Sequence, residues 1–164
     1  MTDNQTKGEY ALAILRIILG WMFLWAFFDK LFGLGFSTPA GSGMIDGGSP
    51  SSFVVYVTGG IFGDLFNNLA GNGFIDILMM LGLLALSISL ILGITSKLGT
   101  FGAILFCVMM FLLHVPPSDN PIVDYHIVYV IAILAVYWLG GFGRLSLYDK
   151  WMSMGIVKRF PILQ

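Results

Sequence analysis

The chain has few charged residues and few side chains suited to covalent or metal chemistry. Only 10% of its 164 residues are charged, whereas a soluble domain usually carries about 25%. It contains two histidines and one cysteine, Cys107. A single cysteine excludes an intrachain disulfide, a dithiol redox pair and a cysteine-rich metal cluster. Because Cys107 lies inside an apolar segment, we expect it to pack as a small apolar residue.

Apolar residues dominate instead, making up 57% of the chain, and the mean hydropathy is +0.90. They form continuous runs close to the length of about 20 residues that a helix needs to cross a bilayer. Continuous runs argue against a transmembrane barrel, whose strands alternate apolar and polar residues. We therefore predict an all-α membrane protein, a single domain over residues 1–164. It is expected to be a four-transmembrane-helix bundle with spans near 10–32, 74–94, 98–115 and 123–139.

Basic residues are distributed unevenly around these predicted spans. Seven of the eight lie before or early in span one, between spans two and three, or after span four. Cytoplasmic segments carry an excess of Lys and Arg, which predicts that both termini are cytoplasmic in a multi-pass protein of the cell membrane. Arg16, in the first turns of span one, is expected to snorkel to the inner interface.

The connections on the opposite, outer side contain residues that are typical of turns. The loop over residues 33–73, between spans one and two, is long for so small a protein, and such loops are often lids. A plain surface loop is the alternative. Within it, Gly47-Gly48-Ser49-Pro50 is typical of a turn that leads into a helix. Before span four, Asp119 or Asn120 is expected to be the helix cap.

Ionisable residues stand at the predicted outer end of every span. Charge near hydrocarbon is costly, so each such group is a functional-site hypothesis. Lys30 is suited to hold an anion or a polarised carbonyl oxygen, and the histidines and carboxylates are candidate proton carriers. The alternatives are an interfacial Asp29–Lys30 pair and a helix-start carboxylate at Asp76. The candidate catalytic residues are Lys30, His114, Asp124, His126, Asp29 and Asp76.

Aromatic residues recur at helical spacing in span one. Trp21, Trp25, Phe28 and Phe32 form a stripe that suits packing or lipid contact, or a slot for a flat ring such as a quinone. Tyr129 follows His126 on one face of span four. We take Trp21, Trp25, Phe28 and Tyr129 as candidate quinone-binding residues. Haem or metal ligation is not expected, because no Cys or His-rich tract accompanies the two histidines.

Several stretches occur in an order and spacing that resemble a known family. They are Leu15-Arg16-Ile17 through Phe28-Asp29-Lys30-Leu31-Phe32-Gly33, then Gly47-Gly48-Ser49-Pro50-Ser51, Asn120-Pro121-Ile122-Val123-Asp124-Tyr125-His126, and Gly140-Gly141-Phe142-Gly143-Arg144 with Leu147 and Asp149. Together they cover nearly the whole chain. In this respect the chain resembles the DoxX/DoxD-like family of small four-helix membrane proteins.

The resemblance implies a redox role. DoxD-like members are subunits of a thiosulfate:quinone oxidoreductase of sulfur metabolism and the respiratory chain, and a smaller second subunit accompanies them. The expectation is a membrane subunit of a quinone-linked oxidoreductase, with thiosulfate as candidate donor and its site at the outer face. The alternatives are a non-catalytic anchoring or assembly subunit of a redox complex, and a small-solute transporter. The expected partners are the lipid bilayer and a second membrane or outer-face subunit, not nucleic acid, and an oligomer remains open.

The charge of the outer side bears on this expectation. Six of the nine acidic residues lie there, with Lys30 as the single base. An acidic surface repels a dianion such as thiosulfate. Lys30, or a basic partner subunit, would have to overcome that repulsion locally.

Overall fold

The computed structural model describes residues 3–56, 62–117, 120 and 122–164. Within these ranges every regular element is a helix, and no strand occurs. The elements are α1 (Asp3–Phe32), η1 (Met44–Asp46), α2 (Pro50–Tyr56), α3 (Gly63–Asn67), α4 (Gly73–Leu92), α5 (Ser96–His114), α6 (Tyr125–Trp138), α7 (Tyr148–Ser153), α8 (Gly155–Arg159) and η2 (Pro161–Leu163).

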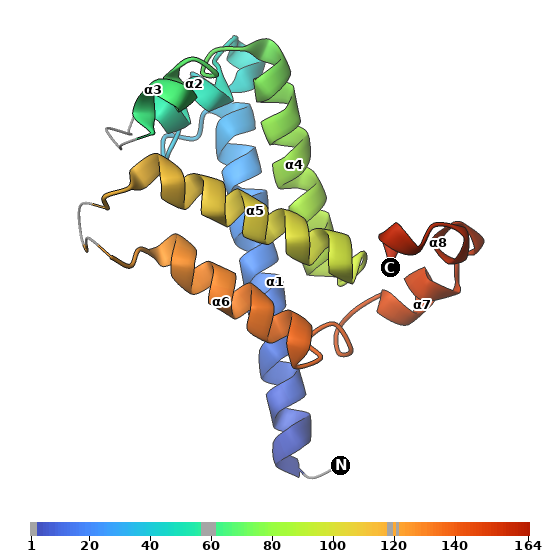
Figure 1. Cartoon of the computed structure of the whole chain (residues 1–164). Coiled ribbons are helices and arrows are strands. Elements are labelled where there is room, and N and C mark those ends of the chain that lie inside the picture. The colour runs from blue at the N-terminus through green and yellow to red at the C-terminus, as the bar shows by residue number, and fades with distance from the viewer. Residues whose placement is uncertain (1–2, 57–61, 118–119, 121) are drawn as a thin grey trace.

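The long helices pack in two pairs. α1 lies along α4 and α5 lies along α6, while contacts of α4 with α5 and of α1 with α6 join the pairs. Figure 1 shows α5 and α6 running side by side across α1. The buried core between the helices consists of apolar side chains from all four, with Phe142 beyond α6. Its members are Leu19, Phe23, Met80, Leu83, Leu86, Leu90, Ala103, Cys107, Ile133, Val136 and Phe142.

Among the described residues, three helices are long and apolar enough to cross a membrane: α1, α4 and α5. They match the first three predicted spans to within a few residues, except that α1 begins at Asp3 instead of near residue 10. α6 is also apolar but has 14 residues, which corresponds to about 21 Å of helix. The prediction of an all-α protein is therefore confirmed for the described residues, and three apolar helices of this length are consistent with a membrane protein. Cys107 is buried, as expected.

α1 continues for 30 residues because no proline interrupts it between Asp3 and Phe32. It ends at Gly33, whose φ of +60° is in the left-handed region and whose N–H donates to the Asp29 carbonyl at 2.8 Å. Gly20, halfway along, lets α4 approach closely. A Cβ atom at Gly20 would lie 2.8 Å from Cγ1 of Ile91. The close packing of α1 against α4 thus requires a glycine at position 20.

The connection between α1 and α4 contains short helices of its own. The turn at Gly47–Ser49 leads into α2 at Pro50, as the sequence predicts. The Ser49 hydroxyl accepts a hydrogen bond from the Ser52 N–H at 3.3 Å and so caps α2. α2 packs on α4 and contacts α3. Residues 57–61 of the predicted loop lie outside the described residues.

The start of α6 differs from the prediction. Asp124, not Asn120, is the N-cap: its Oδ1 accepts hydrogen bonds from the N–H groups of His126 and Ile127 at 2.9 and 3.2 Å. The Asn120 side chain instead accepts from Ile122 and Val123 in the preceding turn. Asn120 is too far from α6 because residues 122–124 are not helical. Asp119, the other candidate, lies outside the described residues.

Arg16 also differs from the prediction, because it is fully buried instead of snorkelling to an interface. The chain after α6 folds back over it. The guanidinium Nη2 donates to the carbonyls of Leu145 at 2.6 Å and Arg144 at 3.4 Å, and the Phe142 ring lies 5.4 Å away. On the other side, a Cβ at Gly93 would lie 1.6 Å from Nη1. Arg16 therefore joins α1, the end of α4 and the turn after α6.

Candidate functional site

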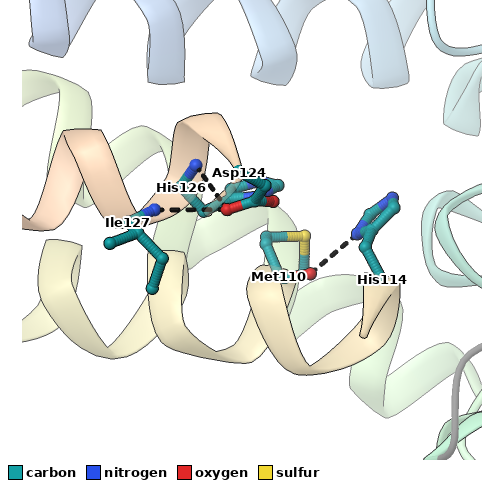
Figure 2. Close-up of polar contacts among 5 residues, drawn as sticks. All are labelled: Met110, His114, Asp124, His126 and Ile127. Carbon is teal, nitrogen blue, oxygen red and sulfur yellow. Dashed lines mark hydrogen bonds and ion pairs between the residues drawn. The ribbon is translucent and has the colours of Figure 1, made fainter. Parts of the chain in front are cut away.

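The carboxylate of Asp124 has a second contact besides its role as a helix cap. Its Oδ2 lies 2.6 Å from Nδ1 of His126, and both side chains are about nine-tenths buried. Figure 2 shows the carboxylate between the imidazole and the N–H of Ile127. A carboxylate accepts but does not donate, so Nδ1 carries the hydrogen and Nε2 is left with its lone pair. This tautomer makes His126 a proton acceptor at Nε2, and Asp124 stabilises the imidazolium that forms.

His114, the other histidine, comes from the last turn of α5. Its ring centroid lies 5.6 Å from that of His126. Its Nδ1 lies 2.7 Å from the carbonyl of Met110, one turn earlier, which fixes the hydrogen on Nδ1 and leaves Nε2 as the acceptor (Figure 2). The structure thus brings three of the six predicted catalytic residues, Asp124, His126 and His114, together at the facing ends of α5 and α6.

A cavity of about 120 Å³ adjoins His126 between the four long helices. Its wall is almost wholly apolar, and its polar groups are the imidazole of His126, the phenol of Tyr129 and the thiol of Cys107. For comparison, a dry cavity of about 150 Å³ holds one benzene molecule. The cavity is therefore somewhat smaller than this reference but of the same order of size, and it lies beside a proton acceptor. The lining residues are Leu19, Met22, Phe23, Ala26, Leu83, Phe106, Cys107, His126 and Tyr129.

Asp29 and Lys30 lie at the end of α1 and contact the loop that follows it. The Asp29 carboxylate is buried and accepts hydrogen bonds from the N–H groups of Phe36, Ser37 and Thr38 and from the Ser37 hydroxyl, at 2.7–3.1 Å. Lys30, also buried, donates to the Ser37 hydroxyl at 3.0 Å. These contacts fold the loop back onto α1. Asp29 therefore has a structural role that the sequence analysis did not assign.

Asp76 has a similar position in the first turn of α4. Its Oδ1 accepts from the Ser51 N–H at 2.8 Å and from the Ser49 hydroxyl at 3.0 Å. Both donors lie at the start of α2, so this carboxylate fastens α2 to α4. Neither Asp29 nor Asp76 contacts the His126 cluster in the described hydrogen bonds and ion pairs. The single site that the sequence predicts is thus divided in the structure. Two carboxylates, Asp29 and Asp76, hold loops in place, and the histidine cluster is separate from them.

The aromatic stripe of α1 lies apart from the cavity. Trp21, Trp25 and Phe28 are absent from its lining. Trp21 and Trp25 pack against each other at 6.4 Å and are exposed on the bundle surface, and the Trp25 ring also contacts Phe36 edge-on at 5.0 Å. Phe28 stacks on Phe32. Of the four predicted ring-binding residues, Tyr129 alone lines the cavity.

Comparisons with family models, with curated proteins and with solved structures found no match. The resemblance to the DoxX/DoxD-like family therefore remains a prediction from the motifs.

The apolar wall of the cavity was not predictable from the sequence. On α1 its members follow helical spacing, since Phe23 lies four residues after Leu19 and Ala26 three after Phe23. That spacing marks a core-facing stripe, but it does not distinguish a filled core from one with a void. On α5, the sequence pattern likewise does not identify Phe106 and Cys107 as residues that line a void. The void results from how the four helices cross.

The arrangement suits proton transfer to a small apolar ring better than metal chemistry. In the described part of the chain, no three His, Cys, Asp or Glu side chains lie together in a way that could hold a metal ion. The His126–Asp124 pair instead supplies an imidazole in the wall of an otherwise apolar cavity. Such a pair can take up or deliver one proton at Nε2.

Proposed function

We propose that the chain is the quinone-binding membrane subunit of a quinone-linked oxidoreductase, and that the cavity holds the quinone ring. The observation that carries this proposal is the position of His126, paired with Asp124, in the wall of an otherwise apolar cavity of about 120 Å³. Ligand sites are typically apolar with a few placed polar groups. A quinone ring has that chemistry, since two carbonyl oxygens interrupt an otherwise apolar disc.

The cavity wall would hold the ring by shape and by aromatic contact. Phe23 and Phe106 meet edge-to-face with ring centroids 5.7 Å apart, and both line the cavity. Aromatic walls favour a flat ring over a branched aliphatic molecule of similar size. Met22 also lines the cavity and is partly exposed on the bundle surface. An isoprenoid tail could leave toward lipid on that side.

His126 would exchange the proton that accompanies electron transfer. A bound quinone takes up two electrons and two protons when it is reduced. Protonated His126 donates from Nε2 to a carbonyl oxygen, and neutral His126 accepts from a hydroxyl. Asp124 keeps the imidazole in one orientation in both states. His114, whose ring centroid lies 5.6 Å from that of His126, is a further group that can carry a proton to the site.

Lys30 is the candidate for holding an anionic electron donor such as thiosulfate. On α1 it lies four residues after Ala26 and seven after Phe23, hence on the face that lines the cavity. Its ammonium contacts Ser37 and lies beside the Asp29 carboxylate, which offsets part of its charge. An anion would therefore have to compete with Asp29. This supports a partner subunit that supplies further positive charge.

The proposal includes the predicted topology. α6 would complete a fourth crossing beside α1, α4 and α5, with both termini in the cytoplasm and the His126 cluster toward the outer face of the cell membrane. The α1, α4 and α5 lengths support the first three crossings. The basic residues near the chain ends support the orientation.

A matched pair of variants tests the quinone site directly. Ala26→Phe places a ring in the cavity, whereas Ala11→Phe adds the same ring at an exposed position of the same helix. The purified chain in nanodiscs should bind a short-chain quinone analogue, as measured by equilibrium partition of the analogue. Ala26→Phe should abolish saturable binding, and Ala11→Phe should retain it. Equal binding by both variants would overturn the cavity as the site.

A second experiment separates a catalytic subunit from an anchor. The chain is purified together with its native partners, and reduction of the quinone analogue by thiosulfate is followed. His126→Gln should abolish turnover while the complex stays assembled. Turnover that survives both His126→Gln and Ala26→Phe would leave the chain as a non-catalytic anchor. That alternative is favoured by the use of Asp29 and Asp76 as loop fasteners.

A further inference from the structure

The C-terminal segment, residues 148–164, is folded and packs against the helical bundle. It contains α7, α8 and η2, which contact one another, and η2 packs on α5. Two backbone hydrogen bonds tie it and the preceding turn to the bundle: Leu147 N–H to the Leu92 carbonyl at 2.8 Å, and Lys97 N–H to the Gln164 carbonyl at 3.1 Å. Val157 is fully buried. Figure 1 shows this segment beside the end of α4.

The segment exposes basic and large apolar side chains together. Lys150, Lys158 and Arg159 are exposed. The exposed apolar side chains of the same segment are Met154, Ile156, Phe160 and Ile162. Asp149 is its one acidic residue. A surface that combines unneutralised cations with large apolar groups is typical of segments that lie in a membrane interface.

The cations of this segment differ from the other basic residues near the chain ends. Lys7 pairs with Asp3 at 2.5 Å. Arg144 pairs with Glu9 at 2.9 Å, and this hydrogen bond raises the pKa of the Arg144 guanidinium. Among the described residues, no ion pair involves Lys97 or the three basic residues of the segment, Lys150, Lys158 and Arg159. Their charge is available to an external anion.

The position of the segment indicates which class of anion it would bind. Leu92 ends α4 and Lys97 is in the first turn of α5, so their backbone contacts hold the segment where two membrane-length helices meet. This is the boundary of any bilayer that the two helices cross. The Trp151 indole N–H donates to the Leu163 carbonyl at 2.6 Å, and tryptophan is enriched at that depth.

We propose that residues 148–164, with Lys97, form a docking surface for the headgroups of anionic phospholipids in the adjoining leaflet. The basic side chains contact the phosphates, and Phe160 and Ile162 enter the apolar region below. The proposal rests on the membrane location of the chain and is independent of the quinone site.

Trp151 provides a local probe of the surrounding lipid. In the full chain, Trp21, Trp25 and Trp138 are replaced by Phe, which leaves Trp151 as the single tryptophan. The protein is placed in nanodiscs of phosphatidylcholine that contain either brominated phosphatidylglycerol or brominated phosphatidylcholine. Quenching of Trp151 then reports which lipid is enriched beside the segment. We expect the anionic lipid to quench more strongly at equal mole fraction.

Variants of the same protein test the cause of that preference. Lys150→Gln, Lys158→Gln and Arg159→Gln should each weaken it up to about fivefold, and the triple variant should remove it. Lys158→Arg and the paired-lysine variant Lys7→Gln should leave it unchanged. Equal quenching by both lipids in the parent, or an undiminished preference in the triple variant, would overturn the proposal. So would loss of the preference on addition of inorganic phosphate at constant ionic strength, because a free-anion site would then explain it.

Discussion

The imidazole Nδ1 of His126 lies 2.6 Å from Oδ2 of Asp124, while Oδ1 of the same carboxylate caps the first turn of α6. One residue thus begins the helix and orients the proton acceptor on it. Any movement of the α6 start would shift His126 relative to the cavity. The geometry of the candidate site is therefore tied to the local stability of this helix end.

The first prediction separates the two roles of Asp124. Asp124→Ala should lower the free energy of unfolding by about 2 kcal/mol, because it removes a helix cap and a charge-assisted hydrogen bond. Asp124→Asn keeps a capping oxygen and should cost less. Both variants should lose proton delivery by His126, measured as quinone turnover in the complex. Unfolding in mixed micelles gives the stabilities, with exposed Asp149→Ala as control. Equal stability of Asp124→Ala and the parent would contradict the capping role.

The second prediction concerns the loop after α1. Asp29→Ala leaves the donors of Phe36, Ser37 and Thr38 without their acceptor and Lys30 buried without its neighbouring charge. We expect a loss of about 3 kcal/mol or more. The loop should also become accessible to protease, which limited digestion followed by mass spectrometry would detect.

Two further variants control this experiment. Asp64→Ala, at an exposed position of α3, should leave the digestion pattern unchanged. Asp29→Ala combined with Lys30→Met should recover part of the stability, because no unpaired buried charge remains. If Asp29→Ala digests like the parent, the carboxylate does not hold the loop.

The third prediction is a coupling between Arg16 and Gly93. Gly93 has φ of +66° and touches the guanidinium, so Gly93→Ala should destabilise the protein by about 2 kcal/mol through strain and steric conflict. In an Arg16→Ala background the conflict with the guanidinium disappears, while the conflict with Cβ of Ser146 at 2.5 Å remains. The lost part should appear as an interaction energy of about 1 kcal/mol between the two sites. A double-mutant cycle of unfolding free energies measures it. Additive effects would place the guanidinium away from the α4 end.

The fourth prediction tests the close approach of α1 and α4. Gly20→Val should force the helices apart, since a Cβ there already meets Ile91 at 2.8 Å, and should cost about 2 kcal/mol. Gly82→Val on α4 is the matched control, because nothing lies within 4 Å of a Cβ at that position. Thermal unfolding in detergent compares the two. A similar loss at both positions would show that helix propensity, not packing, is responsible.

The helices and their caps show how much of the structure could be predicted from local sequence. Apolar runs and their breaks located α4, α5 and the end of α1 within a few residues, because burial in lipid needs length and hydropathy alone. The N-cap of α6 was assigned to Asp119 or Asn120 because both precede the apolar run. Asp124 took that role because the chain stays extended until residue 124. Helix ends depend on such local competition, which a pattern does not resolve.

Arg16 and Asp29 show why charged residues were harder to place. In sequence, Arg16 is a base near a helix start and Asp29 an acid near a helix end, and both patterns suit an interface. The structure buries both, because segments distant from Arg16 and adjacent to Asp29 fold over them and supply carbonyl and N–H partners. Such partners are invisible until the backbone path is known.

The sequence by itself determined that this protein is helical, suited to a membrane, and provided with ionisable groups near the ends of its apolar segments. Those properties follow from composition and from the spacing of polar residues. Only the tertiary structure decided which of those groups share a site. It separated Asp29 and Asp76, which fasten loops, from His126, which lines an apolar cavity, and from Asp124, which pairs with His126. The reason is physical: a cavity and its polar end exist only where helices cross, and the crossing depends on contacts between residues far apart in the chain.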